Sequence, residues 1–597
     1  MRERVNSVYR LVQHQAQQIP DAPAIRSIDQ PPISYRTLFQ YVTNTMRRLH
    51  QLNIQQQDRV AIVLPNGVAM ATSFLSTACA AVAAPLNPAY RAAEYEFYLT
   101  DLNARALITQ PDLDSPAVQV ARRLNIPVIE MPSIYERANE NIAEIATDVA
   151  LPTADDIALI LHTSGTTSRP KIVPLTHGNL CASARNISQT LALTSADRCL
   201  NIMPLFHIHG LLGVLLSSLY AGASVVCTPG FDAPHLLDWL RETQATWYSA
   251  VPTMHQAILA RAEAEKPRTA LRLIRSSSAS LPPSVMQAME QTFGVPVIEA
   301  YGMTEAAHQM ASNPLPPLPR KPGSVGMAAG PEIAIMDAAG QLLPAAVTGE
   351  VVIRGENVTL GYENNVAANQ TAFTNGWFRT GDQGYLDRDG YLFLTGRLKE
   401  LINRGGEKIS PREVDEVLLT HPAVAQAVAF AVPHTRLGED VAAAVVLRAQ
   451  ASVTEHDLRD YCSHHLTDFK VPSRIVFLTD IPKGPTGKLQ RIGLAAQLGI
   501  TEALDDTAGE SDYLAPRNAV EQQLAQLWSE VLRIPATQIG IQMPFLSLGG
   551  DSMLATRLVT RVRKQFKVTM TIVEFFNAAT VEEQAALISG ALLTTSI

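Results

Sequence analysis

The sequence predicts an α/β protein built from several compact parts. Its 597 residues exceed what one hydrophobic core normally contains, so three or four units are expected. Between residues 60 and 353, short runs rich in β-branched residues alternate with longer helical patterns. This alternation is typical of parallel, doubly wound sheets. The residues after 516 show helical periodicity alone, which predicts a small helical bundle.

The large N-terminal part is predicted to contain two stacked α/β subdomains. The strands expected there are Val60–Leu64, Ala106–Ile108, Ile126–Ile129, Ile157–His162, Ser224–Cys227, Leu271–Ser276 and Val297–Ala300. The most apolar stretch, residues 208–227, contains His209, three serines and three glycines. We interpret it as a buried helix that leads into a buried strand, and not as a membrane span.

The pattern of predicted secondary structure changes at residue 349. Short alternating strands and the turns Asn375-Gly376 and Asp389-Gly390 predict antiparallel structure up to Leu394. A smaller α+β part follows, with strands over Val424–Val432 and Val441–Leu447. The predicted boundaries are 1–396, 397–498, a polar linker at 499–516 and 517–597, with helices over Val520–Leu532, Met553–Phe566 and Val581–Leu592.

Composition narrows the class of protein. With 48 basic and 56 acidic residues the net charge is −8, and no basic-aromatic stripe occurs, so a nucleic-acid partner is not expected. Five scattered cysteines form no Cys-x-x-Cys pair, which argues against a zinc site or a disulfide framework: Cys79, Cys181, Cys199, Cys227 and Cys462. The first residues lack the apolar core of a signal peptide, and we expect a cytoplasmic location.

A hydroxyl-rich loop is the first chemical motif. Leu161-His-Thr-Ser-Gly-Thr-Thr-Ser-Arg-Pro-Lys171 follows a predicted strand and precedes a helix expected to start near Thr176. Backbone N–H groups and hydroxyls there suit a phosphate chain. It is not a Walker loop, because Gly-Lys-Thr is absent and Pro170 interrupts it. A surface turn rich in Ser and Thr is the plain alternative.

With this loop and six further motifs, the chain resembles the adenylate-forming superfamily of acyl-CoA synthetases, luciferases and peptide-synthetase adenylation domains. The further motifs are Pro204-Leu-Phe-His-Ile-His-Gly210, Tyr301-Gly-Met-Thr-Glu305, Trp377-Phe-Arg-Thr-Gly-Asp382, Gly396-Arg-Leu-Lys-Glu400, Gly405-Gly-Glu-Lys-Ile-Ser-Pro411 and Pro485-Thr-Gly-Lys488. The resemblance spans residues 1–498 and is strongest to ligases of the oxalate–CoA type. It implies two doubly wound subdomains plus a distorted β-barrel, then a small mobile α+β domain.

The resemblance implies an ATP- and Mg²⁺-dependent acid–thiol ligase, and it assigns roles to particular residues. ATP would be held by Thr163, Ser164, Gly165, Thr166, Thr167, Lys171, Ser277, Ser278, Ala279, Tyr301, Gly302, Thr304, Asp382 and Arg397. Magnesium would be bound by Glu305 and Thr166. Lys488, Glu305 and His207 would be catalytic, with the Lys488 ammonium bridging the substrate carboxylate and the α-phosphate. Two departures from the family, Ser168 and Ile172 where glycines are usual, put the handling of pyrophosphate in question.

For the second half-reaction the resemblance implies a hinge at Lys399 and a pantetheine tunnel lined by Gly405 and Gly406. The pattern Leu548-Gly-Gly-Asp-Ser552 at a helix start resembles acyl and peptidyl carrier proteins, in a four-helix bundle. Ser552 would then carry 4′-phosphopantetheine, attached by a phosphopantetheinyl transferase. A helix N-cap is the alternative role for this serine.

The identity of the acid is the least determined feature. His207, Trp247, Ser249, Ser276 and His308 lie where the family builds its acyl pocket. Two histidines and several hydroxyls favour a small polar acid or a dicarboxylate. Histidine gating without such anchoring is the competing interpretation.

Three functions are therefore weighed. The favoured one is a module that loads an acid onto its own Ser552 arm for a separate synthase or condensing enzyme of polyketide or peptide assembly. The second is a free acyl-CoA ligase, with CoA as the thiol. The third is a scaffold without catalysis, which Ser168 and Ile172 support and which Lys488, Glu305, Asp382 and Arg397 oppose. Hydride transfer is not expected, since no Gly-x-Gly-x-x-Gly loop follows the early strands.

Overall fold

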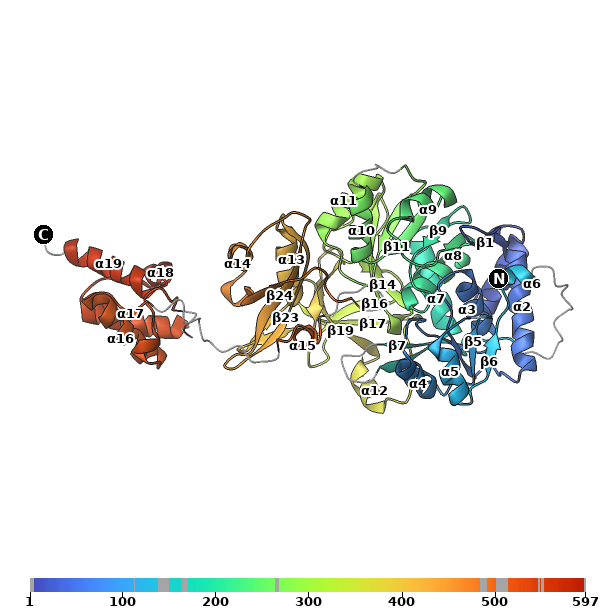
Figure 1. Cartoon of the computed structure of the whole chain (residues 1–597), viewed down its shortest axis with the longest axis horizontal. Coiled ribbons are helices and arrows are strands. Elements are labelled where there is room, and N and C mark those ends of the chain that lie inside the picture. The colour runs from blue at the N-terminus through green and yellow to red at the C-terminus, as the bar shows by residue number, and fades with distance from the viewer. Residues whose placement is uncertain are drawn as a thin grey trace. The chain divides into compact units, whose positions relative to one another are not determined.

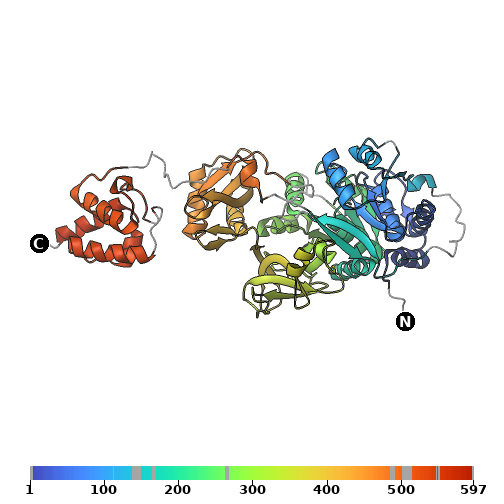
Figure 2. The same cartoon turned by 90° about the horizontal axis from the view of Figure 1, so that it is seen from below.

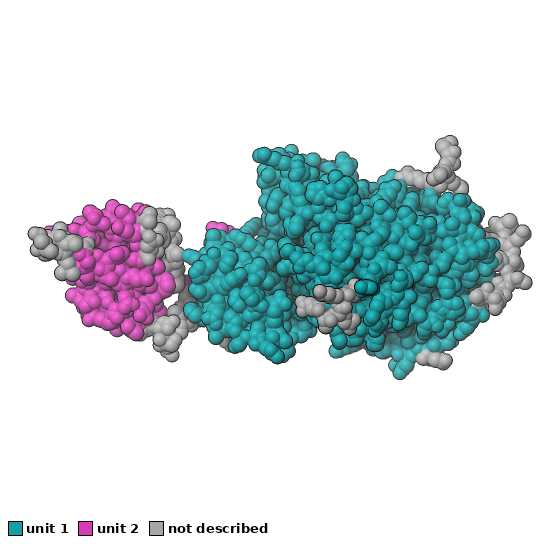
Figure 3. Space-filling model, turned by 90° about the horizontal axis from the view of Figure 1, so that it is seen from above, with its two compact units in different colours: residues 1–402, 408–431, 441–497 teal, residues 403–407, 432–440, 498–597 magenta. Residues whose placement is uncertain are grey.

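A computed structural model describes residues 5–111, 113–137, 150–163, 170–262, 268–483, 491–500, 514–545, 548 and 552–594. The chain divides into two compact units, coloured teal and magenta in Figure 3. One comprises residues 1–402, 408–431 and 441–497, and the other comprises residues 403–407, 432–440 and 498–597. The four boundaries drawn from the sequence stay predictions.

A nine-stranded sheet forms the centre of the first unit. Its order is β15 (Met327–Ala328), β14 (His308–Ser312), β13 (Val297–Met303), β12 (Leu273–Ser276), β11 (Trp247–Ala250), β9 (Arg198–Asn201), β10 (Ser224–Cys227), β1 (Pro23–Arg26) and β2 (Ile33–Ser34). The strands from β13 to β1 run parallel, and the two ends of the sheet are antiparallel. Strands β10, β11 and β12 are buried along their whole length, as expected for parallel strands covered on both faces.

A six-stranded sheet lies in the same unit. Its order is β6 (Val128–Glu130), β5 (Ala106–Thr109), β3 (Arg59–Ile62), β4 (Val82–Pro85), β7 (Ile157–Thr163) and β8 (Lys171–Thr176). All neighbours are parallel except β7 and β8, which form an antiparallel pair at the edge. Pro174 lies in this edge strand. A proline has no backbone N–H to donate, and an edge strand tolerates this because it pairs with a neighbour on one side only.

Helices cover both sheets (Figures 1 and 2), and their apolar side chains pack against the strands in the hydrophobic cores. They are α1 (Val8–Gln18), α2 (Tyr35–Gln51), α3 (Val68–Ala80), α4 (Ala92–Asp101), α5 (Pro116–Arg123), α6 (Ile134–Arg137), α7 (His177–Thr190), α8 (Ser217–Tyr220), α9 (Leu236–Thr243), α10 (Pro252–Ala262) and α11 (Pro283–Phe293). Local chemistry starts several of them: Ser7 caps α1, and Thr176 and Asn179 form a capping box at α7.

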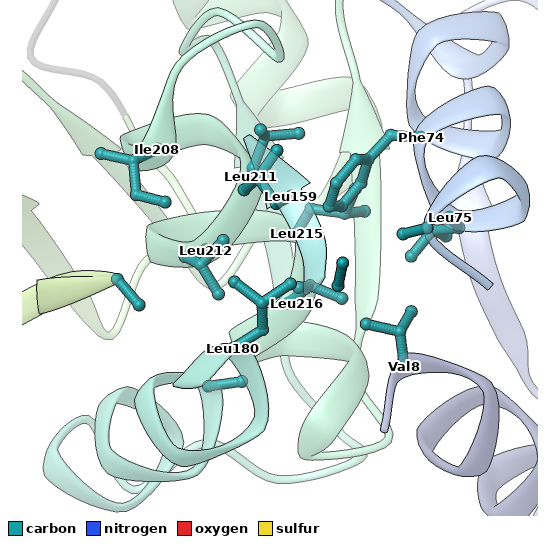
Figure 4. Packing of buried hydrophobic residues seen from close by; sticks show 14 of the residues in the cluster. Val8, Phe74, Leu75, Leu159, Leu180, Ile208, Leu211, Leu212, Leu215 and Leu216 are labelled. Carbon is teal, nitrogen blue, oxygen red and sulfur yellow. The ribbon is translucent and has the colours of Figure 1, made fainter. Parts of the chain in front are cut away.

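The predicted buried helix at residues 208–227 is present, and its first part is a π-helix. This helix, η1 (His209–Leu216), continues into α8 and then into β10. Figure 4 shows its side chains, among them Leu211, Leu212, Leu215 and Leu216, packed against residues of α1, α3, α7 and β7. The segment is therefore central to the largest core cluster. No helix within the described ranges is long and apolar enough to cross a bilayer.

The antiparallel region predicted from residue 349 is confirmed. A five-stranded sheet has the order β16 (Glu332–Met336), β17 (Gly349–Arg354), β19 (Trp377–Leu386) and β18 (Phe373–Thr374), and β20 (Leu392–Arg397) pairs with β19. Helix α12 (Val366–Ala372) precedes β18. The pairing of β19 with β20 sets Asp382 directly opposite Arg397.

The predicted smaller α+β part also has its own sheet and core. The strand order is β22 (Glu407–Ile409), β21 (Ile402–Arg404), β24 (Gly438–Leu447) and β23 (Val424–His434), with β25 (Arg474–Phe477) parallel to β24. The helices there are α13 (Pro411–Thr420), α14 (Glu455–Ser463), the 3-10 turn η3 (Asp468–Lys470) and α15 (Leu494–Gln497).

The C-terminal region contains helices α16 (Ala519–Leu532), α17 (Ser552–Phe566), α18 (Ile572–Asn577) and α19 (Val581–Thr594), with a 3-10 turn η4 (Ala536–Gln538). These helices close around a separate apolar core. In it the Trp528 ring meets Phe545 edge to face, and the indole N–H donates to Gln584 Oε1 over 3.1 Å. The three helices predicted from periodicity are found, and α18, which periodicity did not locate, is the fourth helix of the bundle that the resemblance implies.

Candidate active site

Predicted site residues gather near the C-terminal ends of β11, β12 and β13. Ser249 is paired in register with Arg275, and Ser276 with Glu299. Tyr301 and Gly302 lie in the last part of β13. In open α/β sheets, ligands bind outside the carboxyl ends of the parallel strands. The position of these residues therefore fits a ligand site.

One group of residues, which we call the carboxylate cluster, combines acidic, basic and phenolic side chains. It consists of Lys171, Tyr301, Glu305, Tyr362, Asp382 and Arg397. Asp382 is its centre and is only 5% exposed. Its carboxylate accepts hydrogen bonds from the Tyr301 hydroxyl and from Arg397 Nε, the latter over 2.8 Å. The Asp382 charge raises the pKa of Arg397 above its usual value.

Glu305 forms the second half of the carboxylate cluster. It lies in the 3-10 turn η2 (Thr304–Ala306), directly after Thr304, and is buried. Its Oε1 accepts a hydrogen bond from the Tyr362 hydroxyl over 2.8 Å, and Lys171 Nζ lies 4.1 Å from the centre of the Tyr362 ring. Burial raises the pKa of Glu305 and lowers that of Lys171. A nearby cation would stabilise the ionised form of Glu305.

The chemistry of Glu305 fits a bound magnesium ion. Mg²⁺ is usually held by one or two carboxylates together with phosphate oxygens and water. Glu305 is a buried carboxylate of this kind, and its raised pKa reflects a charge that burial leaves poorly solvated. The described residues contain no group of three or more His, Cys, Asp or Glu side chains that could hold a metal ion.

A second group, which we call the histidine cluster, contains His209, Ser249, Arg275, Ser278 and His308. The His209 ring joins two hydroxyls: Nε2 lies 2.7 Å from Ser249 Oγ, and Nδ1 lies 3.0 Å from Ser278 Oγ. The rings of His209 and His308 stack with their centres 4.9 Å apart. Arg275 Nη1 is 3.0 Å from His308 Nε2 and 3.4 Å from Ser249 Oγ. Ser249 and His308 were predicted pocket residues, and the structure brings them together.

Three residues in or next to the histidine cluster have a strained backbone. Ser278, Ala307 and His308 have φ values of 74°, 46° and 94°, a region that residues with a Cβ rarely adopt. Buried side chains hold the turn: Ser183 Oγ donates to the Ala307 carbonyl over 2.5 Å, and Asn357 Nδ2 donates to the Ala306 carbonyl over 2.7 Å. Such strain persists only where the surroundings fix it, and it concentrates at functional sites.

Two glycines give the histidine turn its space. A Cβ on Gly213 would lie 2.6 Å from His308 Nε2, and a Cβ on Gly302 would lie 1.7 Å from the His308 carbonyl oxygen. Gly302 was predicted to bind ATP. Its position against His308 gives it a structural reason to be glycine, independent of any ligand.

The hydroxyl-rich loop departs from the expected strand–loop–helix arrangement. Strand β8 lies between the loop and helix α7, so the loop joins two antiparallel strands and Thr163 pairs with Lys171. The helix does begin after Thr176, as predicted, but its N-terminus is separated from the loop by β8. The sequence analysis missed this strand because a six-residue apolar run before a helix resembles a helix start.

Ile172 has a packing role that explains the departure from glycine. It is 6% exposed and belongs to the core that covers the six-stranded sheet. Ser164, Gly165, Thr166, Thr167 and Ser168 lie outside the described residues, so their predicted contacts with phosphate and magnesium stay predictions.

The other predicted pocket residues have varied surroundings. His207 is half-buried, and its Nδ1 accepts the backbone N–H of His209 over 3.3 Å. Trp247 is fully buried within the main apolar core. Ser276 is also fully buried. Ser277 donates to the Ala300 carbonyl over 3.0 Å, and Ala279 is exposed.

The proposed hinge and tunnel residues lie in exposed backbone. Lys399 is exposed, and Gly405 and Gly406 have φ values of 59° and 100°, which favour glycine. Lys488 lies outside the described residues. Arg491, three residues later, is held by Asp415 Oδ2 over 2.6 Å and by Glu400 Oε2 over 3.3 Å. Ser552 is the first residue of α17.

Sequence reasoning missed three residues of the two clusters. His209 is two residues from the predicted His207, and Arg275 precedes the predicted Ser276. Tyr362 lies 57 residues after Glu305 and joins it only through the fold. The twin histidines of Pro204-Leu-Phe-His-Ile-His-Gly210 were the one available signal, and spacing alone did not distinguish them.

Three family models match parts of the chain. A family model described as AMP-binding enzyme matches residues 12–363, and its C-terminal domain model matches residues 413–488. A third model, phosphopantetheine attachment site, matches residues 522–588.

Individual relatives align over most of their length. An oxalate–CoA ligase of Arabidopsis thaliana is 46% identical over 498 residues, covering 81% of this chain and 96% of that protein. A sulfoacetate–CoA ligase of Cupriavidus necator is 37% identical over 491 residues, covering 81% and 96%. The structure of O-succinylbenzoate coenzyme A synthetase (MenE) from Bacillus subtilis, in complex with ATP and magnesium ion, superimposes with a TM-score of 0.72 at 31% identity, covering 81% of this chain and 98% of that one.

Proposed function

Because the chain belongs to the AMP-binding enzyme family, we propose that it loads a small acid onto its own carrier domain. It is an acid–thiol ligase that activates an acid with ATP by adenylation, and it ends in a phosphopantetheine attachment domain. In the proposed reaction a carboxylate attacks the α-phosphorus and releases pyrophosphate. Ser552 would hold the phosphopantetheine arm, whose thiol would accept the acyl group with AMP as the leaving group.

The presence of an adenylating part and a phosphopantetheine attachment site in one chain supports this proposal. The attachment-site match spans residues 522–588 and includes Ser552 at the start of α17. The C-terminal helices have their own core, as a carrier domain requires. When attached, phosphopantetheine supplies the thiol on a long flexible arm. Its attachment implies modification by a phosphopantetheinyl transferase.

We assign nucleotide binding to the carboxylate cluster. Asp382 would accept both ribose hydroxyls in place of its present donor from Tyr301, whose ring would then lie on the adenine. Arg397 stays beside Asp382 and places its remaining N–H donors near the phosphate. Lys171, half-buried near Glu305, adds a positive charge on the side of the phosphate chain.

For the adenylation step we assign Glu305 and Thr166 to magnesium and Lys488 to the transition state. The ion, when bound, neutralises the phosphate oxygens and favours departure of pyrophosphate. Lys488 would approach the reacting carboxylate and the α-phosphate as their charge rearranges. Arg491, fixed by Asp415 and Glu400, anchors the end of the segment that bears Lys488.

We assign the acyl pocket to the histidine cluster with His207 at its edge. Oxalate, sulfoacetate and succinylbenzoate, which name the substrates of the relatives, each carry a second anionic group. A small acid with two anionic groups is therefore the proposed substrate class. The polar lining made by Ser249, Ser278 and two histidines supports it.

A free CoA ligase is the second candidate function. The relatives above are named as CoA ligases, and 81% of this chain suffices to cover 96% of the Arabidopsis protein. In that case CoA would be the thiol and the carrier domain would serve another step.

Intact-protein mass measurement distinguishes the two. The full chain is treated with a phosphopantetheinyl transferase and CoA, freed of CoA, and given ATP, Mg²⁺ and a panel of mono- and dianionic acids. We expect the mass of one phosphopantetheine, then an ATP-dependent acyl increment from a dianionic acid. Pantetheine without acyl, together with acyl-CoA when CoA is added back, would contradict self-loading.

Two variants locate the steps. Ser552→Ala should lose both mass increments and keep acid-dependent pyrophosphate exchange. Lys488→Ala should take up pantetheine but lose pyrophosphate exchange by at least about 100-fold, because it lacks the transition-state cation. Lys483→Ala, which removes a lysine paired with Asp480 shortly before the same segment, is the matched control and should retain exchange. Near-normal exchange in Lys488→Ala would refute its assignment.

A further inference from the structure

Arg275 is a buried positive charge that no carboxylate among the described residues pairs with. It lies in β12 and is fully buried. Its hydrogen bonds go to Ser249 Oγ, His308 Nε2 and Gln309 Oε1, which are all neutral groups, and its Nε proton has no partner among the described residues. Burial lowers its pKa to about 10, which still leaves it charged at neutral pH.

Five other arginines each form an ion pair with a carboxylate. The pairs are Arg272 with Asp197, Arg379 with Glu350, Arg397 with Asp382, Arg404 with Asp440 and Arg491 with Asp415. A buried charge is costly unless an ion pair or a ligand compensates it. Within the part of the chain that the structure describes, Arg275 has neutral partners, so we look to a ligand for its counter-charge.

The contact with His308 determines the state of that ring. A guanidinium only donates hydrogen bonds, so His308 Nε2 accepts from Arg275 and the ring proton is on Nδ1. His308 is therefore neutral in this arrangement and leaves the positive charge of Arg275 undiminished. The strained backbone at His308 and the glycine at position 213 fix the ring in this contact.

We propose that Arg275 is a positioning residue that makes the acyl pocket selective for acids with a second anionic group. It acts through His308 and Ser249: it orients both side chains toward the pocket and supplies the positive potential that the distal carboxylate or sulfonate meets. This inference rests on the proposed function, because it takes the histidine cluster as the acyl pocket.

The geometry favours the distal group over the reacting carboxylate. The reacting carboxylate must meet the α-phosphate beside Glu305 and Lys171, which belong to the carboxylate cluster. If the Arg275 charge acted on the reacting carboxylate, removing it would lower activity toward every acid equally. If it acts on the distal anionic group, removing it would lower activity only toward acids that have such a group. Kinetics with paired acids measure this difference.

The test compares paired acids of matched length, oxalate with glyoxylate and malonate with propionate, in pyrophosphate exchange. Arg275→Gln keeps a donor for His308 and removes the charge. We expect kcat/KM for the diacids to fall about 100-fold, mainly through KM, and for the monoacids less than about threefold. Arg275→Lys restores the charge and should recover diacid selectivity to within about tenfold of the parent enzyme.

Arg272→Gln is the matched control. Arg272 lies one residue before the same strand, and its charge is compensated by Asp197 over 2.6 Å. Its substitution should lower thermal stability and leave the ratio of diacid to monoacid unchanged. A thermal shift of the full chain by each diacid, in the presence of a non-hydrolysable ATP analogue, gives a readout without turnover and should be lost in Arg275→Gln.

Several outcomes would overturn the inference. Equal losses for diacids and monoacids would mean a structural or general role, and failure of Arg275→Lys to restore selectivity would exclude the charge. If Arg275→Gln does not fold, an unmodified enzyme that prefers monoacids decides against it. An enzyme that adenylates none of a broad panel of acids would instead contradict the proposed function itself, which separates the two failures.

Discussion

The carboxylate cluster and the histidine cluster solve the problem of buried charge in opposite ways. In the first, Asp382 and Arg397 neutralise each other, and Glu305 lies near Lys171 and Arg397. In the second, Arg275 lies among two histidines, a serine and a glutamine. In the carboxylate cluster the positive and negative side-chain charges compensate each other without a ligand, whereas in the histidine cluster the positive charge of Arg275 is uncompensated among the described residues.

The difference indicates what each cluster recognises. A balanced cluster can exchange internal hydrogen bonds for bonds to a ligand that brings its own cation, as a magnesium nucleotide does. An unbalanced cluster gains most from a ligand that brings an anion. Recognition of the acid should therefore depend on net charge, whereas recognition of the nucleotide should depend on hydrogen-bond geometry.

The largest predicted effect comes from unbalancing the carboxylate cluster. Asp382→Asn keeps the shape but removes the charge that Arg397 and the Tyr301 hydroxyl share. We expect kcat/KM for ATP to fall about 100-fold or more, since two charge-assisted hydrogen bonds are lost. Steady-state pyrophosphate exchange measures this. Glu332→Gln, which breaks an exposed pair with Arg354 in the same sheet, should have little effect, and equal losses in both variants would refute the distinction.

A smaller effect is expected when the histidine cluster is displaced without a change of charge. Gly213→Ala would put a methyl group 2.6 Å from His308 Nε2 and 3.0 Å from His209 Cδ2. Because the rings must shift, we expect the KM for the acid to rise about tenfold and stability to fall by about 1–3 kcal/mol. The KM for ATP serves as the internal control and should stay within about twofold. A change in the two KM values together would argue that the clusters are one site.

The smallest effect concerns Glu299, a buried acid that belongs to neither cluster. Its Oε1 accepts the Leu281 backbone N–H over 2.9 Å, and burial raises its pKa to about 7. A raised folded-state pKa of an acid means that folding loses stability as pH rises from about 4.5 to about 7, and the loss is complete above that range.

Glu299→Gln keeps the acceptor and removes this penalty. We expect its melting temperature to exceed that of the parent by about 2–5 °C at pH 8 and to match it near pH 5. Scanning calorimetry across this pH range checks the sign. A variant that is less stable at pH 8 would show that the carboxylate is ionised and compensated.

The sequence could predict the carboxylate cluster better than the histidine cluster. Tyr301, Glu305, Asp382 and Arg397 stand in short motifs with turn-forming neighbours, so their types and spacing identify them. His209 and Arg275 lie in a buried helix and a buried parallel strand, where every position is covered and periodicity distinguishes no face.

The same limit explains the missed strand β8. Its residues Ile172, Val173 and Leu175 are buried like those of a helix start, and only the pairing with β7 reveals an edge strand. Elements with strong local patterns were predictable, whereas the antiparallel strand β8, the backbone strain and contacts such as that of Tyr362 with Glu305 depend on long-range folding.

The C-terminal helices have an apolar core of their own, and this has a consequence for how multidomain chains of this kind evolve. Trp528, Phe545 and Phe575 pack on one another, and Gln584 satisfies the indole from within the same region. A region that needs no neighbour to bury its aromatic rings can be joined to another gene, or exchanged for a different copy, without repacking either side of the junction. Recombination at the segment before Asn518 should therefore yield folded chimaeras.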